Sequence, residues 1–149
     1  MQREELKVKI IKLIEEAKLG SLATINEGRP WVRYMVIHPD KGSNGKFGLY
    51  STTFANSRKV AQINQNPNVH IAIGGDPHNW QAPYLNIRAQ AKVVTDIETK
   101  KNCWCDMLKQ FFSGPEDDNY AVIKISPQII EYMSPGARQP EVYEVIIYE

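Results

Sequence analysis

The chain has 149 residues, 42% hydrophobic and 23% charged, so it can form one domain with a core and is too short for us to expect two. Its 18 Lys and Arg residues nearly balance its 17 Asp and Glu residues, and a net charge of +1 argues against a broadly basic nucleic-acid-binding surface. No apolar run approaches the roughly 18–20 residues of a membrane helix, and the N-terminus does not resemble a signal peptide. We therefore expect residues 1–149 to form a single cytoplasmic domain that binds neither nucleic acid nor membrane.

The charges are unevenly distributed along the chain. Residues 29–59 contain six cations and one acid, a local charge of +5, whereas residues 97–149 contain nine acids and five cations. A basic segment in a nearly neutral protein indicates a small anionic ligand rather than a polymer. The alternative is that these charges are simply solvated at the surface. The six cations are Arg29, Arg33, Lys41, Lys46, Arg58 and Lys59.

The first half of the chain begins with a helix and continues with short strands. Residues 4–17 have apolar side chains at helical spacing, and Gly20 is expected to end this helix. Strand-like runs follow, and Asn26-Glu27-Gly28 has the composition of a hairpin turn. A second, short helix is predicted at residues 57–65. The predicted strands of this half are residues 22–25, 31–38 and 47–53.

The second half contains the clearest strand signal. Residues 84–94 alternate between apolar and polar side chains, the pattern of an antiparallel strand with one buried face. Residues 95–98 have capping-box spacing and predict a helix that continues to Phe112. Six or more short strands with few helices predict an α+β fold, mostly antiparallel β, in which a small barrel has flanking helices. The other predicted strands of this half are residues 69–73, 121–125, 129–133 and 142–148.

Arg33 is the first candidate for ligand binding. It lies in the predicted strand 31–38, whose two faces are both largely apolar. A partly buried guanidinium group needs an anion or a full set of hydrogen-bond acceptors. The sequence therefore favours an anion near Arg33; an ordinary arginine at the mouth of a barrel is the alternative.

A second candidate site begins with Ser57, at the start of the predicted short helix. Arg58 and Lys59 occupy its first turn, where a cation is unfavourable by roughly 0.3–1 kcal/mol because the helix dipole is positive there. An anion at this helix end would compensate both cations and would accept hydrogen bonds from N–H and hydroxyl groups. The hydroxyl run 51–53 precedes the helix, although threonine is also common in strands for packing reasons. Together these features predict a phosphate-binding pocket.

The remaining reactive side chains do not form a recognisable catalytic or metal site. Cys103 and Cys105 are two residues apart on the predicted helix and so do not face each other, and we expect Cys105 to be in the core and Cys103 to be more exposed. The three histidines lack metal-ligand spacing. We therefore assign no metal ligand and no catalytic acid or base.

The aromatic loop 78–84 contains Trp80 and allows two interpretations. It could cover a planar ring in a ligand cleft. It could also pack at a subunit interface, where aromatic residues are enriched.

Two segments carry a resemblance to a known family. Residues 57–69, SRKVAQINQNPNV, resemble the S-R-K-x-x-x-I-x-x-N-P-x-V segment of the pyridoxamine 5′-phosphate oxidase-like flavoproteins. The G-R-P-x-x-R-x-M run at residues 28–35 is similar to the second strand of that family. A looser match extends over residues 19–133, and residues 130–133 resemble the general-stress-protein branch.

The resemblance implies an FMN-binding split β-barrel with Greek-key connections, usually a homodimer with the flavin between the subunits. By position, Arg33 and Lys59 would bind the FMN phosphate, Arg58 would help to hold it, and the backbone of residues 34–36 would lie along the ring. Tyr84 stands where the family often has a glutamine that contacts the ring. The implied cofactor-binding residues are Arg33, Tyr34, Met35, Val36, Ser51, Thr52, Thr53, Ser57, Arg58, Lys59 and Tyr84.

The C-terminal region departs from the vitamin-synthesising oxidases of this family. Those enzymes have a tryptophan followed by a basic run, whereas this chain has Met133 followed by Arg138 alone. We therefore expect an FMN-dependent oxidoreductase with an unknown substrate other than pyridoxamine phosphate. The alternatives are a non-catalytic flavin-binding stress or sensor protein, and a relative of the same fold that uses haem or a deazaflavin.

Overall fold

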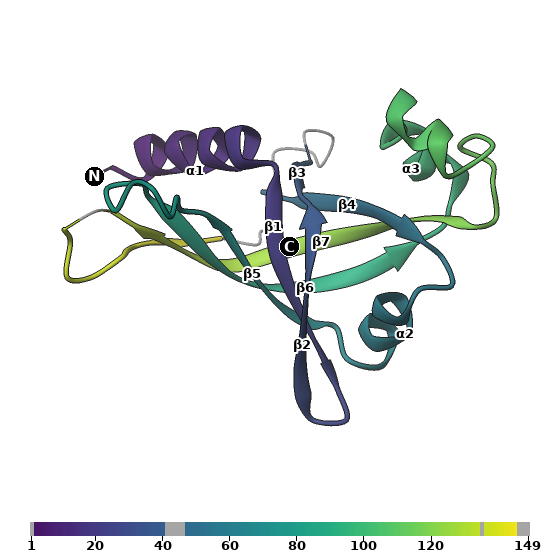
Figure 1. The fold of residues 1–149 in the computed structure, drawn as a ribbon, viewed down its shortest axis with the longest axis horizontal. Coiled ribbons are helices and arrows are strands. Elements are labelled where there is room, and N and C mark those ends of the chain that lie inside the picture. Colours follow the sequence, from purple (N-terminus) through teal and green to yellow (C-terminus); the bar gives the residue numbers. More distant parts are fainter. Residues whose placement is uncertain (1, 41–46, 135, 146–149) are drawn as a thin grey trace.

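One curled antiparallel sheet forms the body of the molecule in the computed structural model, which describes residues 2–40, 47–134 and 136–145 (Figure 1). Within these residues the sheet has eight strands in the order β2-β1-β5-β6-β7-β4-β3, with β8 beside β7. The path ends at β2 on one side and β3 on the other, so the barrel is open. This arrangement confirms the predicted α+β split barrel with flanking helices.

The described elements have the following bounds. The strands are β1 (Leu19–Asn26), β2 (Arg29–Val36), β3 (His38–Pro39), β4 (Leu49–Phe54), β5 (Asn68–Gly74), β6 (Tyr84–Val94), β7 (Tyr120–Met133) and β8 (Glu141–Glu144). The helices are α1 (Arg3–Ala17), α2 (Arg58–Gln65) and α3 (Ile97–Asn102), followed by a 3₁₀ turn over Asp106–Gln110. Of the predicted strand 142–148, residues 146–148 lie outside the described part.

Helix α1 packs against β3, β5 and β8 through one apolar stripe of buried residues, Leu6, Ile10 and Ile14. The helix ends at Lys18, whose φ of 62° breaks the helical path, and not at Gly20 as the sequence predicted. Gly20 belongs to β1, where a Cβ atom would lie only 3.2 Å from Ile37. Its small size therefore serves the packing of the sheet.

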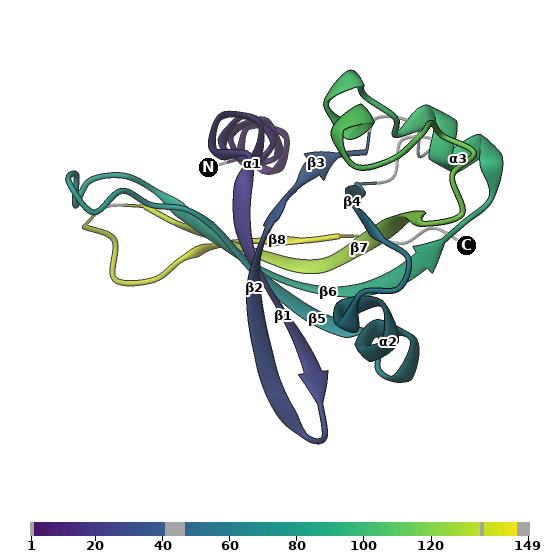
Figure 2. The ribbon, with the colours of Figure 1, turned by 45° about the vertical axis from the view of Figure 1, so that its right-hand side comes forward.

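Strands β1 and β2 form a hairpin that projects from the body of the molecule (Figure 2). Its turn residues Glu27 and Gly28 both have positive φ, as a two-residue primed turn requires, which confirms the predicted turn. The predicted single strand 31–38 is wrong, because the chain pairs with β1 up to Val36 and then switches to β4 through β3. That switch leaves β2 at the edge of the sheet.

Strand β7 is one long strand where the sequence predicted two. Its pairing with β6 shifts register at Gln128, so that Arg88 faces Ile129 and Ala89 faces Pro127. Proline lacks an N–H group and is tolerated at such a bulge. The backbone oxygen of Gln128 accepts a hydrogen bond from Val145. The bulge thus lets β7 continue through residues 126–128, where the sequence predicted a gap between two strands.

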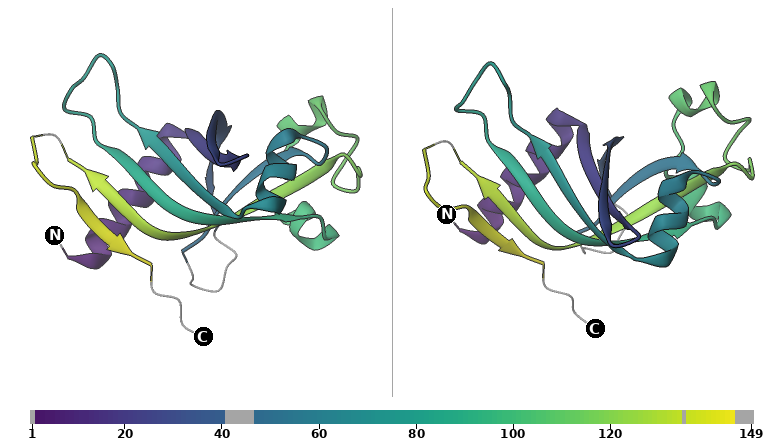
Figure 3. Two further views of the ribbon diagram at one scale, coloured as in Figure 1. Left: turned by 90° about the horizontal axis from the view of Figure 1, so that it is seen from below. Right: turned by 60° about the horizontal axis from the view of Figure 1, so that its bottom comes forward.

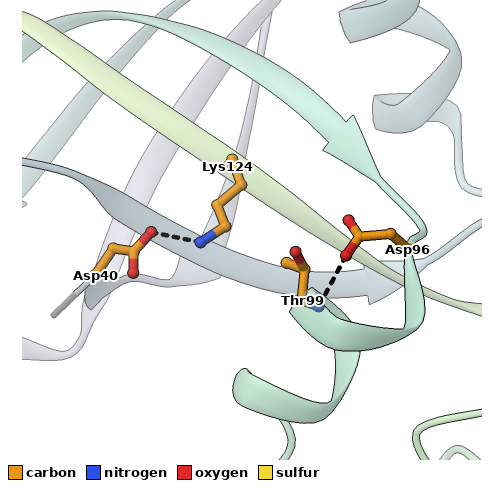
Figure 4. Close-up of polar contacts among 4 residues, drawn as sticks. All are labelled: Asp40, Asp96, Thr99 and Lys124. Carbon is orange, nitrogen blue, oxygen red and sulfur yellow. Dashed lines mark hydrogen bonds and ion pairs between the residues drawn. The ribbon is translucent and has the colours of Figure 1, made fainter. Parts of the chain in front are cut away.

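The predicted helix from residue 95 to Phe112 is wrong in its length. Asp96 caps α3 by accepting a hydrogen bond from the Thr99 N–H (Figure 4), and the helix ends after Asn102. The same hydrogen bond is the main cause that lowers the pKa of Asp96. Residues 102–106, Asn-Cys-Trp-Cys-Asp, have low helix propensity, and tertiary contacts outweigh what remains. The chain continues as a separate 3₁₀ turn.

This break reverses the expectation for the two cysteines. Cys103 is buried and Cys105 is exposed, and neither lies within α3, because the helix ends after Asn102. Cys103 belongs to a second, smaller core cluster with Phe112 and Tyr120, separate from the main core inside the sheet. Viewed from below, this region and α2 lie at one end of the molecule and the β5–β6 hairpin lies at the other (Figure 3). No helix in the described residues is long and apolar enough to span a membrane.

We expect Ile10→Ala to lower the free energy of unfolding by about 2–5 kcal/mol, because Ile10 is fully buried beneath α1 and its truncation leaves a cavity. Val8→Ala is the matched control on the same helix, since Val8 is 65% exposed, and it should change stability by less than about 0.5 kcal/mol. Urea unfolding curves measure both. Equal effects of the two substitutions would show that α1 does not dock as described.

Candidate functional site

A cleft of about 340 Å³ opens between β2, β4 and the segment 103–112, and we call it the β2–β4 cleft. One end of it is polar and the opposite wall is apolar and aromatic. Its lining residues are Tyr34, Met35, Val36, His38, Tyr50, Thr52, Thr53, Phe54, Lys59, Cys103, Trp104, Cys105, Met107, Leu108, Phe111 and Phe112. The cleft therefore suits a ligand that has a charged end and a flat apolar part.

Lys59 provides the charge at the polar end. It lies in the first turn of α2, and its Nζ atom donates a hydrogen bond to Thr53 Oγ1 at 3.1 Å. Burial lowers the pKa of Lys59, and the positive charge of Arg33 lowers it further. The ammonium group is thus placed where its own charge is unfavourable until an anion joins it.

Arg33 adjoins this end and is fixed by neutral oxygen atoms. Its guanidinium group donates to Thr24 Oγ1 at 2.6 Å, to Gln62 Oε1 at 2.8 Å and to the backbone oxygen of Trp31 at 3.0 Å. Thr24 and Gln62 are both buried and are hydrogen-bonded to each other. These contacts orient the guanidinium group without neutralising it. Its pKa is lowered first by burial and then by Arg58.

Arg33, Arg58 and Lys59 together form what we call the cationic cluster. The Arg58 guanidinium carbon lies 5.6 Å from the centroid of the Trp31 ring. Within the described part of the chain, none of the three cations forms an ion pair with a carboxylate. Like charges that interact without an acid between them form a site for an anion.

The hydroxyl groups near the cationic cluster have two different roles. Thr53 Oγ1 lies 3.5 Å from Ser57 Oγ, and Ser57 makes no side-chain cap to α2, so both hydroxyls are placed to meet a ligand beside Lys59. Ser51 is buried and donates to the backbone oxygen of Val36 at 2.7 Å. Ser51 thus joins β4 to the end of β2 and positions the wall of the cleft.

The structure brings most of the predicted site residues together. Six line the β2–β4 cleft, and four adjoin it through hydrogen bonds or charge. Tyr84 lies apart, in a separate cleft of about 180 Å³ that is lined by residues of β1 and β5 and also by Tyr34. The six are Tyr34, Met35, Val36, Thr52, Thr53 and Lys59; the four are Arg33, Ser51, Ser57 and Arg58.

Sequence reasoning missed the acceptors of Arg33 and the apolar wall. The sequence could have indicated Thr24, because it lies two residues from Leu22 and so points to the same, buried face of β1. A polar side chain on that face needs a hydrogen-bond partner inside the protein. The predicted helix that continues to Phe112 would have placed the wall residues Trp104 and Phe111 together on one apolar stripe. Only the break after Asn102 turns them toward the cleft.

A larger cavity of about 820 Å³ adjoins the cleft and lies between α1, β3 and α3. The stacked rings of His38 and Tyr50, with centroids 4.9 Å apart, line both spaces. Burial, together with the charge of Lys18, lowers the pKa of His38. An ion pair between Lys124 and Asp40 lies in the wall of the larger cavity (Figure 4). A second molecule could therefore be held beside a ligand in the β2–β4 cleft.

Comparison with known proteins identifies relatives that match most of the chain. The family model for pyridoxamine 5′-phosphate oxidase matches residues 6–134. General stress protein 26 of Bacillus subtilis (strain 168) is 31% identical over 140 residues, which cover 94% of this chain and 96% of that protein.

Solved structures give the same result for the fold. General stress protein 26 from Bacillus anthracis str. Sterne is 30% identical, with a TM-score of 0.77 over 95% of this chain and 99% of that chain. A Clostridium acetobutylicum protein related to general stress protein 26 is 17% identical, with a TM-score of 0.76 over 97% of this chain and 96% of that chain. The latter likeness concerns the fold alone. The split-barrel fold is thus shared with these proteins.

The lowered pKa of Lys59 predicts how the stability of the ligand-free protein depends on pH. Because this pKa is lower in the folded than in the unfolded state, the unfolded state binds more protons between the folded-state pKa and the ordinary lysine value of 10.5, and stability rises with pH across that interval. We expect Lys59→Met to reduce this rise by at most about 1 kcal/mol in total, since water screens a half-buried group. The exposed Lys92→Met is the control. Identical pH profiles of wild type and Lys59→Met, from urea unfolding, would contradict the prediction.

Proposed function

Because the chain belongs to the pyridoxamine 5′-phosphate oxidase family, we propose that it binds FMN in the β2–β4 cleft and acts as an oxidoreductase. The observation that carries the proposal is the cationic cluster, which has no acidic partner among the described residues and stands beside an apolar, aromatic wall. FMN has the complementary form, with a phosphate at one end and a flat ring system at the other.

The residues at the polar end fit a phosphate group. Lys59 and Arg33 supply the positive charge, and the hydroxyls of Thr53 and Ser57 supply further donors at the start of α2. Charge-assisted hydrogen bonds of this kind are about twice as strong as neutral ones. The pKa of Lys59 is lowered by burial and further by the charge of Arg33, and a bound phosphate would offset both effects.

The remaining walls fit a flat ring. The chain at residues 34–36 forms one side, and Trp104, Met107 and Phe111 form the other. FMN supplies the electron transfer when it is bound, while the protein provides position and a water-poor surrounding. His38, whose lowered pKa favours the neutral imidazole, stands at the junction with the larger cavity and can exchange a proton with a reactant held there.

The proposed assembly is a homodimer in the cytoplasm. Edge strand β2 exposes Val32 and Tyr34, which are 64% and 74% exposed, and neighbouring Leu19 on β1 is 52% exposed. Apolar side chains grouped on an edge strand are typical of an interface. A second copy packed there would lie beside the β2–β4 cleft.

We expect FMN to bind at least about 100-fold more tightly than riboflavin, because two charge-assisted contacts of roughly 1.5–3 kcal/mol each are lost with the phosphate. Isothermal titration calorimetry measures both affinities. Equal affinities would contradict phosphate recognition. The absorption spectrum of the purified protein separates a flavin from haem.

The double variant Arg33→Ala/Lys59→Ala should purify folded but colourless, because it removes two members of the cationic cluster. Arg29→Ala is the matched control, since it removes an exposed cation at the start of β2 and should retain flavin. Flavin absorbance per folded protein is the measurement. Full occupancy in the double variant would overturn the assignment of these two residues.

An oxidoreductase should reduce its bound flavin with a physiological donor. We expect NADH or NADPH to bleach the flavin absorbance of the holoprotein in anaerobic stopped-flow experiments faster than that of free FMN, because the larger cavity can hold the donor beside the cleft. Rates no faster than those of free FMN with either nucleotide would favour the non-catalytic alternative.

A further inference from the structure

Two cysteines line the β2–β4 cleft, one on each side of Trp104. Cys103 and Cys105 are both free, and the sequence contains no other cysteine. The proposed function gives neither thiol a role. Two thiols at one ligand cleft form a candidate redox pair.

The backbone at these cysteines is not helical. Cys103 has a φ of −96° and a ψ of 0°, and Cys105 has a φ of −139° and a ψ of 160°. The rule that side chains two residues apart on a helix do not face each other therefore does not apply. The Cys103 N–H donates to the backbone oxygen of Thr99 at 3.0 Å, and the Cys105 backbone oxygen accepts from the Leu108 N–H at 3.0 Å. The two cysteines thus have defined positions.

The same two tyrosines lie near both thiols. Burial raises the pKa of Tyr50 and of Tyr120, and negative charge on Cys103 and on Cys105 raises both further. Because Coulomb interactions weaken with distance, both sulfur atoms lie in the neighbourhood of these hydroxyls. Cα atoms two residues apart are separated by at most about 7 Å. A disulfide needs about 4.4–6.8 Å, which is within the reach of this pair.

The two thiols differ in access. Cys105 is exposed and meets molecules that approach from solvent. Cys103 is buried, and burial is the main cause that raises its pKa. Thiol–disulfide exchange uses such a division, in which an accessible thiol attacks and a second thiol resolves the mixed disulfide.

A disulfide between Cys103 and Cys105 would close a small ring over a single residue. That residue, Trp104, packs against the second core cluster, with its ring centroid 5.4 Å from that of Tyr120. A disulfide that closes so small a ring on an anchored segment is strained, and strained disulfides are more oxidising and more easily reduced. The pair therefore accepts electrons from a reductant in the cleft and does not supply them.

We propose that Cys103 and Cys105 form a dithiol–disulfide couple that carries electrons from reduced flavin in the β2–β4 cleft to a disulfide substrate. The inference rests on the proposed function and deepens it, because it names the substrate class as a molecule with an accessible disulfide bond. Trp104 belongs to the wall against which the flavin ring is proposed to lie, so the couple adjoins the ring.

The reaction balances in two steps. In the first, the thiolate of Cys105 attacks one sulfur of the substrate disulfide and releases one substrate thiol. Cys103 then attacks the Cys105 sulfur of the mixed disulfide, which releases the second substrate thiol and leaves the Cys103–Cys105 disulfide. In the second step, this disulfide accepts two electrons and two protons from reduced flavin, and its S–S bond breaks to restore both thiols. One substrate disulfide and one reduced flavin thus give two substrate thiols and one oxidised flavin.

Oxidised glutathione tests the first step on the protein as purified, without added reductant. We expect the wild type to lose both free thiols and form an intramolecular disulfide, whereas Cys103→Ala accumulates a stable mixed disulfide at Cys105. Cys105→Ser, altered at an exposed position, should keep Cys103 unreacted. Intact mass and thiol titration distinguish these products. A wild type that stops at the mixed disulfide, cross-links to a second chain or does not react overturns the proposal.

Anaerobic stopped-flow mixing tests the second step. The flavin of the holoprotein is reduced by light and then mixed with oxidised glutathione. We expect flavin absorbance to return at least about tenfold faster in the wild type than in Cys105→Ser, because the couple holds the electron acceptor beside the ring. Gln110→Ala is the matched control, since Gln110 is exposed on the same segment and does not line the cleft. Equal rates in the wild type and Cys105→Ser overturn the proposal while leaving FMN binding intact.

Reductive titration separates this proposal from the proposed function. We expect the disulfide form of the wild type to take up two electrons in the disulfide and two in the flavin, and Cys105→Ser to take up only the two of the flavin. Equal uptake by both proteins overturns the couple and leaves the flavoprotein intact. A wild type that forms the disulfide but binds no FMN overturns the flavin site and, with it, this electron transfer.

Discussion

The site depends on cations that are oriented by neutral partners. Arg33 donates to Thr24, Gln62 and a backbone oxygen, and none of these can cancel its charge. A carboxylate in their place would have paired with the guanidinium group and offset its positive charge. Because the described residues provide neutral acceptors instead, the positive charge of the cluster remains directed at the cleft. Burial lowers the pKa of Lys59, and the charge of Arg33 lowers it further. The repulsion costs stability in the ligand-free protein, a cost typical of binding sites.

The fold supplies this arrangement by joining elements that are distant in sequence. Thr24 comes from β1, Gln62 from α2 and Arg33 from the edge strand β2, and their hydrogen bonds tie the helix to the hairpin. Ser51 adds the link between β4 and the end of β2. The polar end is therefore built mainly on ordered secondary structure, which holds the guanidinium group of Arg33 in a defined geometry.

The sequence predicted the polar end of the site better than its apolar wall, for a physical reason. Arg33, Thr53 and Lys59 stand out locally, because a cation in an apolar strand or at a helix start is unfavourable without a ligand. The wall depends on where α3 ends, and this is decided by contacts with distant residues. The hydroxyl of Tyr120 donates to the backbone oxygen of Lys100, and the buried Lys100 Nζ donates to the backbone oxygen of Asp117. Apolar periodicity alone could not show these contacts, and so it predicted one long helix and reversed the burial of the cysteines.

The separation of the two ends has a consequence for specificity. The wall residue Trp104 packs against the second core cluster, which contains Tyr120 and Val122, whereas the acceptors of Arg33 lie between β1 and α2. No hydrogen bond in the described chain joins the two groups directly, so we expect substitutions in the wall to alter the cleft and the adjoining cavity without disturbing the cationic cluster. A chain of this kind can keep its cationic cluster unchanged while substitutions in the apolar wall alter which molecule fits beside it. The Ser-Arg-Lys segment thus determines the charge of the polar end of the cleft, and the segment 103–112 determines the shape of its apolar wall.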